Sequence, residues 1–197
     1  MAMLRLDDLR QHSDRLPLKS GEILTVRFVE PRDAESIQTY FRGLSQQSRY
    51  NRFFGAISQL PPRLLESYIH VGDADQFSVI ATMEVDGHET IVGEARYVFD
   101  NQTSSFEFGL SVDDRWQGRS IGTAILKNME CRAAAFGANR LFGDTLRSND
   151  AMIMLARKSS YVFSQSPGDW KLVRFSKQIH IAPEEIPCAS WRLAKAA

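Results

Sequence analysis

Three strand-like runs that follow one another through tight turns constrain the fold of this chain most. Phe77 to Val85 and Thr90 to Phe99 are rich in β-forming residues, and the hairpin signal Asp86-Gly87 separates them. Asp100-Asn101 opens a second turn before a third run, Ser105 to Val112. Because such short turns join antiparallel neighbours, these residues predict a β-meander. A meander in this position argues against an alternating, doubly wound sheet.

Helices and further strands flank the meander. Before it, a strand at Ile23 to Val29 precedes a helix that starts at Pro31, an aromatic loop at Tyr50 to Leu60, and a helix from Pro61-Pro62 to about His70. After it, the pattern predicts a helix at Ile121 to Phe136, a strand at Leu141 to Leu146, a helix capped by Ser148 or Asn149 that ends near Lys158, and strands at Tyr161 to Phe163 and Leu172 to Phe175. The fold class is therefore mixed α/β.

The length of 197 residues predicts one domain at residues 21–180, with an N-terminal arm at 1–20 and a C-terminal tail at 181–197. The 24 basic residues balance 24 acidic residues, so the charge gives no argument for nucleic acid or a membrane surface as partner. No apolar run approaches the roughly 18–20 residues of a membrane span, and the first residues lack the order of a signal peptide. The 2 cysteines have no paired spacing, which predicts reduced thiols, no metal site and a cytoplasmic location.

A small-residue turn, Gln117 to Gly122, joins the meander to the following helix. Unpaired N–H groups and the positive dipole end at a helix N-terminus can hold a phosphate there. A Walker A loop is excluded because Thr123 stands where its lysine is required, and a dinucleotide fingerprint lies in a βαβ unit, not after a meander. The turn therefore predicts a phosphate-bearing ligand, with an ordinary structural turn as the alternative.

The turn resembles the acetyl-CoA-binding signature Arg/Gln-x-x-Gly-x-Gly/Ala of the GNAT superfamily of N-acetyltransferases, with Ser120 at the usual central glycine. The similarity extends over about Leu24 to Lys177, including the order of elements. Leu44 to Phe54 and Phe106 to Val112 are similar to segments of bacterial protein lysine acetyltransferase domains. The resemblance implies a GNAT-like, mostly antiparallel central sheet with a splayed strand pair, flanked by helices.

The resemblance also implies which residues bind acetyl-CoA. In the family, the third meander strand is bulged and splays from its neighbour, and its backbone pairs with the pantetheine arm. The following turn holds the pyrophosphate, and an asparagine of the later helix often contacts CoA. These positions correspond here to Leu110, Ser111, Val112, Gln117, Gly118, Arg119, Ser120, Ile121, Gly122, Thr123 and Asn149.

Glu107 is the candidate catalytic base, because a neutral amine is needed for acetyl transfer and a free lysine has a pKa near ~10.4. It alternates with apolar neighbours and so points away from their face; an ordinary outward-facing glutamate is the alternative. The tyrosine that often serves relatives as general acid is Ala156 here, and for Tyr161 core packing is favoured over that role. Arg49 and Arg52 line the acceptor side or belong to a packed loop.

These residues favour an acetyl-CoA-dependent N-acetyltransferase that uses direct transfer. The partner is an amine acceptor, either a protein lysine or a small amine, and a homodimer stays open because many relatives dimerise. One alternative is a catalytically weak acyl-CoA-binding regulatory module, suggested by Ser120 and Ala156. A fold-level relative that binds no CoA is a further alternative.

Overall fold

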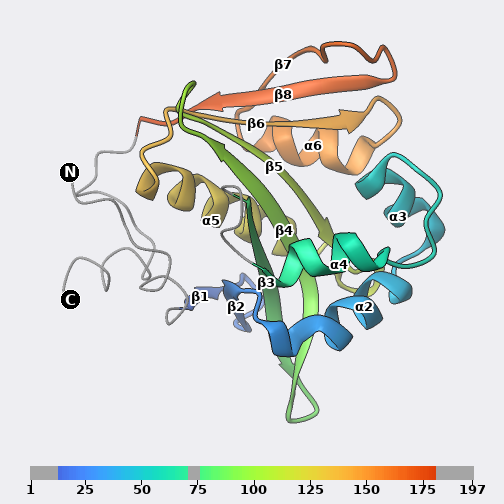
Figure 1. Cartoon of the computed structure of the whole chain (residues 1–197). Helices are drawn as coiled ribbons and strands as arrows, with labels where there is room; N and C mark the ends of the chain where they lie inside the picture. Colours follow the sequence, from blue (N-terminus) through green and yellow to red (C-terminus); the bar gives the residue numbers. More distant parts are fainter. Residues whose placement is uncertain (1–12, 71–75, 181–197) are drawn as a thin grey trace.

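The computed structural model describes residues 13–70 and 76–180. Within these ranges, eight strands form one sheet in the order β1-β2-β3-β4-β5-β6-β8-β7 (Figure 1). The strands are β1 (Asp14–Pro17), β2 (Ile23–Phe28), β3 (Gln76–Val85), β4 (His88–Asp100), β5 (Ser105–Val112), β6 (Arg140–Leu146), β7 (Val162–Gln165) and β8 (Leu172–Gln178). The helices are η1 (Pro31–Asp33), α2 (Ala34–Gly43), α3 (Gln46–Phe53), α4 (Pro62–Ile69), η3 (Asp114–Trp116), α5 (Ile121–Ala135) and α6 (Asp150–Lys158), of which η1 and η3 are 3₁₀ turns.

The predicted meander forms the centre of the sheet. β3 pairs with β4 and β4 pairs with β5, in both cases antiparallel. The only parallel pair among the described strands is β5 with β6. The prediction of a mixed α/β fold with a mostly antiparallel sheet is thus confirmed.

The splayed strand pair is also present. β5 and β6 pair only from Ser105 opposite Arg140 to Glu107 opposite Phe142. Beyond Glu107 the two strands have no paired positions, although both continue for several residues. The edge of β5 that faces β6 is therefore open over its last five residues, which creates space for a ligand between the strands.

The expected bulge in β5 is wrong. β5 keeps an unbroken register with β4, from Gly93 opposite Val112 to Asp100 opposite Ser105. The irregularity lies one strand away, between Ala81 and Thr82 of β3, where β4 contributes one extra residue. The splay therefore comes from the end of pairing with β6, and not from a distortion within β5.

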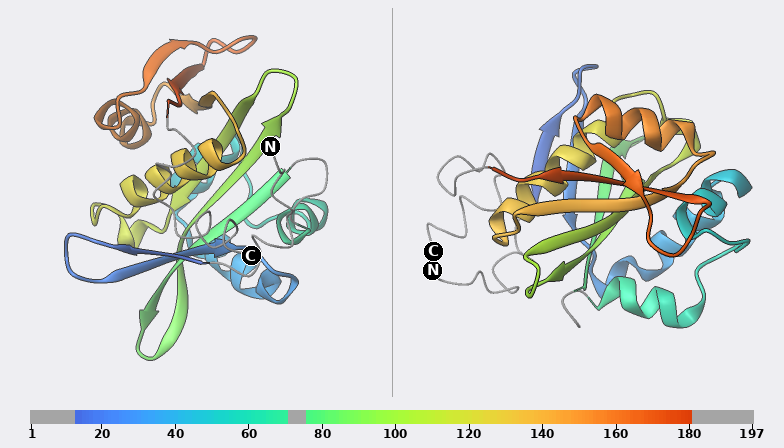
Figure 2. Two further views of the ribbon diagram at one scale, coloured as in Figure 1. Left: turned by 90° about the vertical axis from the view of Figure 1, so that its left-hand side faces the viewer. Right: turned by 90° about the horizontal axis from the view of Figure 1, so that it is seen from above.

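The helices cover both faces of the sheet. α5 packs on one face, where Gly93 of β4 leaves room for the side chain of Ile125, and α2 and α4 lie on the opposite face (Figure 2). Because side chains alternate along a strand, neighbouring residues of β4 serve different faces. Tyr97 stacks on Phe106 in the core beneath α5, whereas Glu94 points toward α3 and α4.

The described part of the predicted arm belongs to the sheet. β1 pairs with β2 in antiparallel register, and the Asp14 carboxylate is buried. It accepts hydrogen bonds from Asn128, at 2.8 Å, and from Arg132, at 3.0 Å, both on α5. These contacts attach β1 to the helix across the sheet. Residues 1–12 and the predicted tail at 181–197 lie outside the described residues.

The predicted loop at Tyr50 to Leu60 is wrong in its first part, because α3 continues to Phe53. Ser45 caps this helix by accepting a hydrogen bond from the Ser48 N–H at 3.1 Å. The sequence of α3 has no apolar stripe, and none of its side chains is fully buried. Asp114 holds it instead, since its carboxylate accepts from Ser45 N–H and from both serine hydroxyls at 2.7–2.8 Å.

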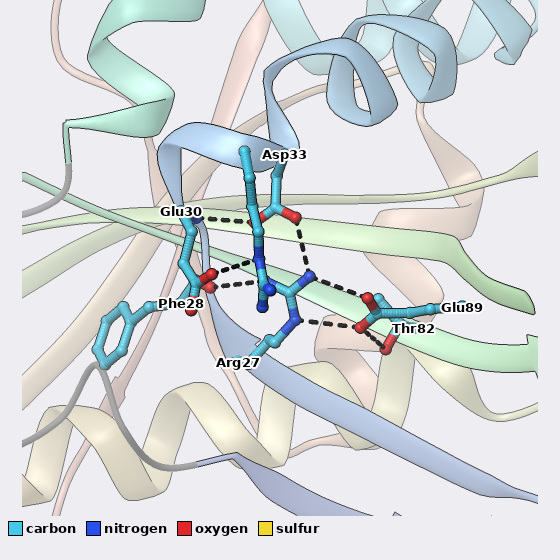
Figure 3. A network of polar contacts seen from close by, with 7 residues as sticks. Arg27, Phe28, Glu30, Asp33, Thr82 and Glu89 are labelled. Atoms are coloured by element: carbon cyan, nitrogen blue, oxygen red, sulfur yellow. Dashed lines mark hydrogen bonds and ion pairs between the residues drawn. The ribbon is translucent and has the colours of Figure 1, made fainter.

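A polar network fixes the beginning of α2 (Figure 3). The Arg27 guanidinium donates to both oxygens of Asp33, at 2.7 and 2.8 Å, and to both oxygens of Glu89, at 3.1 Å. Asp33 also accepts from the Glu30 N–H at 2.8 Å. The network joins β2, the η1 turn and the β3–β4 hairpin. It thereby sets the position of α2, whose Tyr40 reaches Ser111 of β5 at 3.0 Å.

Candidate functional site

The turn before α5 has an unusual backbone. Gly118 and Ser120 both have positive φ angles, of 76° and 67°, and α5 begins directly after them at Ile121. The two left-handed residues turn the chain sharply at the helix start. The N–H groups of the first turn of a helix have no intrahelical partner, so this end of α5 is suited to an anion.

A cavity of about 780 Å³ opens in front of this turn. It runs from the start of α5 along the open edge of β5, and α3 and α6 form its other walls. The predicted cofactor-binding residues that line it are Leu110, Ser111, Val112, Gln117, Gly118, Ser120, Ile121, Gly122, Thr123 and Asn149. Arg119 does not line it; its guanidinium lies 4.7 Å from the centre of the Trp116 ring. The structure therefore brings together all these predicted residues except Arg119.

Asn149 and Gly122 help to shape this larger cavity. The Asn149 side chain caps α6 by accepting from the Met152 N–H at 3.2 Å, and it donates to Thr145 at 3.0 Å. A Cβ atom at Gly122 would lie 3.3 Å from Leu155 of α6. A residue without a side chain at this position thus allows α5 and α6 to approach closely.

A second, smaller cavity of about 420 Å³ lies on the other side of the splay. Glu107, Arg96, Gln76 and Asp144 are among its lining residues. The residues that line both cavities are Asn51, Arg52, Leu110, Asn149 and Met152. The two cavities therefore meet beside Leu110, in the unpaired part of β5. Two molecules that enter from opposite sides would reach each other there.

Glu107 lies in the smaller cavity as its alternation with buried Phe106 and Phe108 predicts. Its side chain is exposed, and no ion pair with it is present among the described residues. The second carboxylate of the cavity, Asp144, is bound by Arg174 at 2.7 Å. Of the two carboxylates, Glu107 is therefore the one available to accept a proton.

Sequence reasoning missed a buried polar cluster beside the junction of the cavities. Glu94 is 1% exposed and accepts hydrogen bonds from Arg52 and Ser111, both at 2.6 Å, and from Tyr68 at 3.3 Å. Burial acts to lower the pKa of Arg52, but Glu94 outweighs it and raises that pKa, so Arg52 keeps its charge. Burial also raises the pKa of Tyr68. The available signal was Glu94, the one carboxylate in the mostly apolar run from Ile91 to Phe99.

Gly109 makes room for this cluster. A Cβ atom at this position would lie 2.6 Å from Nη1 of Arg52. The guanidinium therefore rests directly on the β5 backbone next to Leu110. Of the two arginines predicted for the acceptor side, Arg52 lines both cavities, whereas Arg49 donates to loop carbonyls, including that of Ile57 at 2.9 Å.

The two positions considered for a general acid lie away from both cavities. Ala156 is fully buried on α6 and lines neither cavity. Tyr161 is also buried, with its ring 5.6 Å from that of Phe175 and 6.3 Å from that of Phe108. Burial raises the pKa of Tyr161 well above its usual value. The core-packing interpretation of Tyr161 agrees with this position.

Residues 13–70 and 76–180 contain neither a candidate metal site nor a helix suited to span a membrane. No group of three or more His, Cys, Asp or Glu side chains is arranged to hold a metal ion. No helix in this part of the chain is long and apolar enough to cross a bilayer. Cys131 is buried on α5, and Cys188 lies outside the described residues.

The splayed sheet, with a turn and a helix at its open edge, is the arrangement that the resemblance to the GNAT superfamily implies. The sequence profile of the Acetyltransferase (GNAT) family matches residues 43–161, which is more than half of the chain. The protein therefore belongs to the GNAT family and is an acyltransferase.

Individual relatives agree with this assignment. An acetyltransferase of Pseudomonas aeruginosa is 23% identical over 77% of this chain and 82% of its own length. Acetyltransferase Pat of Mycolicibacterium smegmatis is 28% identical over 68% of this chain, which spans only 40% of that protein. Among solved structures, the GNAT domain of S. lividans PAT has a TM-score of 0.76 at 22% identity, with 84% of this chain and 96% of that domain covered. Spermidine N-acetyltransferase from Vibrio cholerae, solved with CoA and spermine, has a TM-score of 0.65 at 14% identity, with 79% and 95% covered.

Proposed function

We propose that this protein transfers an acetyl group from acetyl-CoA to a primary amine in one direct step. The observation that carries the proposal is the meeting of two cavities along the open edge of β5. A thioester in the larger cavity and an amine in the smaller cavity reach each other beside Leu110. Direct transfer follows from this arrangement, because holding both reactants in one complex supplies the proximity that the reaction needs.

The residues of the larger cavity fit the chemistry of CoA. Backbone N–H groups at Gly122 and Thr123 suit the pyrophosphate, as expected at a helix N-terminus. The open edge from Leu110 to Val112 suits the amides of the pantetheine arm, which would add to β5 as an extra strand. Acetyl-CoA supplies the activated acyl group, and Arg119 is left out of the proposed contacts because it lies on Trp116.

Glu107 acts as the base in this proposal. The amine nitrogen attacks the thioester carbon and its proton passes to Glu107, directly or through water. The carbon–sulfur bond then breaks, and CoA leaves as a thiolate. Because a thiol has a pKa of only about 8.5, the thiolate leaves without a strong acid. Alanine at position 156 is compatible with this chemistry.

The acceptor belongs to one of two classes, a protein lysine or a small amine. The resemblance of Leu44 to Phe54 to protein lysine acetyltransferase domains favours the first class. The spermidine N-acetyltransferase among the structural relatives is named for a small amine. The cytoplasmic location stays a prediction from cysteine usage, and the homodimer stays open.

A catalytically weak acyl-CoA-binding regulatory module is the alternative function. Ser120 favours it, because this residue puts a Cβ atom and left-handed strain at the proposed pyrophosphate site. The alternative expects acetyl-CoA to bind in calorimetry while no amine in an acceptor panel is acetylated.

The variant Glu107→Gln tests the proposal. Loss of the base lowers kcat/KM roughly 10²- to 10⁴-fold, while the affinity for acetyl-CoA stays unchanged. The deficit is largest near about pH 7, because more of the amine is then protonated. The measurement is release of CoA thiol with an acceptor panel. Glu84→Gln, at an exposed position of β3 away from both cavities, is the matched control. Full kcat/KM for Glu107→Gln between about pH 7 and 9 would show that Glu107 is not the base.

A further inference from the structure

The smaller cavity is lined by a positively charged side chain that the proposed chemistry does not use. Arg96 lies on β4, is half-buried and lines this cavity. Its hydrogen-bond and ring partners among the described residues are neutral. Its Nη2 donates to Oε1 of Gln76, and its guanidinium lies 5.1 Å from the centre of the Tyr68 ring. The Arg96 guanidinium cannot act as a base, because it stays protonated. A half-buried guanidinium without an ion-pair partner is suited to bind an anion.

Neighbouring charges leave this wall of the cavity positive. Arg52 and Arg96 are both attracted to the buried carboxylate of Glu94. Arg52 takes both Glu94 oxygens, at 2.6 and 3.2 Å, so two guanidinium groups share one carboxylate. Burial lowers the pKa of Arg96, yet an arginine stays protonated at neutral pH.

A negative group lies on the same face of the sheet as Arg96. Glu107 lines the cavity, and Asp144, the other carboxylate of the lining, is bound by Arg174. Val98 lies opposite Glu107 on β4, and Gln76 lies opposite Val98 on β3, so these three residues form one row across the sheet. Arg96 lies opposite Gly109 of β5, two positions from Glu107, so Arg96 and Glu107 are diagonal neighbours with backbones roughly 7–8 Å apart. The cavity is therefore dipolar over the length of a small molecule.

We infer that the acceptor is a small amine that also carries an anionic group, and that Arg96 binds this group while the amine faces Glu107. The volume of about 420 Å³ suits a metabolite of amino-acid size. Arg96 is thus a specificity-determining residue. The inference rests on the proposed function for the identity of the amine site, but anion binding by Arg96 does not require turnover.

Matched acceptors test the inference on the full chain. Binding is measured with the protein saturated with CoA, and turnover is measured with saturating acetyl-CoA. The probes are 6-aminohexanoate, its neutral amide 6-aminohexanamide, and hexylamine. Charged hydrogen bonds predict that the wild type prefers 6-aminohexanoate over both neutral probes roughly 10- to 100-fold, in calorimetric affinity and in kcat/KM. A lysine in an otherwise neutral peptide serves as the probe for a protein acceptor.

The variant Arg96→Gln removes the preference. Its kcat/KM for 6-aminohexanoate falls toward that for hexylamine, mainly through KM, and the loss is larger for the charged probe than for hexylamine. Arg96→Lys restores part of the preference, and Arg63→Gln, at an exposed position of α4, leaves it intact. Equal loss for charged and neutral probes in Arg96→Gln would overturn the inference, as would wild-type preference for a neutral amine or for the peptide. Preferential binding of 6-aminohexanoate without acetylation of any probe would instead overturn the proposed function and keep the inference.

Discussion

Ser120 shows how one residue links backbone strain to ligand binding. Its φ of 67° lies in the left-handed region, where a Cβ atom crowds the following carbonyl oxygen at a cost of roughly 1–2 kcal/mol. Gln117 and Gly118 precede it in the turn, and Ser120 lines the larger cavity. The strained residue thus stands where a close approach to the pyrophosphate is proposed.

Ser120→Gly is expected to stabilise the protein and to tighten acetyl-CoA binding. Relief of the left-handed strain exceeds the backbone entropy that glycine adds to the unfolded chain, which leaves a gain of roughly 0.5–1 kcal/mol in the free energy of unfolding. Removal of the Cβ atom also opens the turn to the ligand. Urea denaturation and calorimetry with acetyl-CoA measure the two effects.

Ser160→Gly is the matched control for this prediction. Ser160 also has a positive φ, of 64°, but it follows α6 and lines neither cavity. Its replacement should raise stability by a similar amount and leave the affinity for acetyl-CoA unchanged. Equal gains in affinity for both variants, or none for Ser120→Gly, would contradict a role for the Ser120 side chain at the ligand.

At the scale of elements, the divergence of β5 from β6 determines the site. Gly143 of β6 lies close to β5, because a Cβ atom there would lie 2.7 Å from the Phe108 carbonyl oxygen and 2.8 Å from the Phe175 ring. Pairing has ended one position earlier, at Glu107 opposite Phe142. Gly143 therefore marks the point from which the open edge of β5 begins.

Gly143→Ala is expected to destabilise the protein by roughly 1–3 kcal/mol, because neither backbone nor a buried ring can move aside cheaply. Acetyl transfer should fall as well, since β5 must shift. Gly43→Ala, where no atom lies within 4 Å of the added Cβ, is the control; it should leave acetyl transfer unchanged and should not lower stability, because alanine loses less backbone entropy than glycine on folding. Urea denaturation decides the outcome, and equal stability of the two variants would be inconsistent with the close contact.

At the scale of the whole molecule, the Arg27 network connects segments that are distant in sequence (Figure 3). Burial acts to raise the pKa of Asp33, but hydrogen bonds from Arg27 and from the Glu30 N–H outweigh it and lower that pKa. The hydrogen bond from Arg27 also lowers the pKa of Glu89. Both carboxyl groups are therefore more acidic in the folded protein than in the unfolded chain.

Arg27→Gln is expected to lower the free energy of unfolding by about 2 kcal/mol at neutral pH. The contribution of a carboxyl with a lowered pKa is complete above its unfolded value and is lost as pH falls through the folded value. The difference between wild type and variant should thus stay constant from about pH 8 to 5 and shrink below about pH 4.

Denaturation across this pH range checks the prediction for Arg27→Gln. Arg32→Gln is the matched control, because the Arg32 side chain is 72% exposed and its ion pair with Glu30 is expected to add well under about 1 kcal/mol. A difference between wild type and Arg27→Gln that persists undiminished at the acid end would show that ionised Asp33 is not the stabilising group.

The sequence predicted what depends on neighbours along the chain. Hairpin signals and alternation located the meander, and the alternation of Phe106, Glu107 and Phe108 placed the glutamate on the cavity side. The helix start at Ile121 was also predicted correctly, and of the two predicted cap candidates, Ser148 and Asn149, the structure shows Asn149. The α3 helix was partly missed, because tertiary contacts with Asp114 hold it and no apolar stripe reveals it.

The sequence alone thus determined the fold class, the turn before α5 and the orientation of Glu107, because periodicity and turn chemistry are local properties. Only the tertiary structure decided where β5 leaves β6, which predicted residues share a cavity, and that Arg119 lies apart from it. It also decided the charge balance at the junction, since Arg52 and Glu94 are 42 positions apart in sequence. Partnership between such side chains follows from strand register and helix packing, which no local pattern encodes.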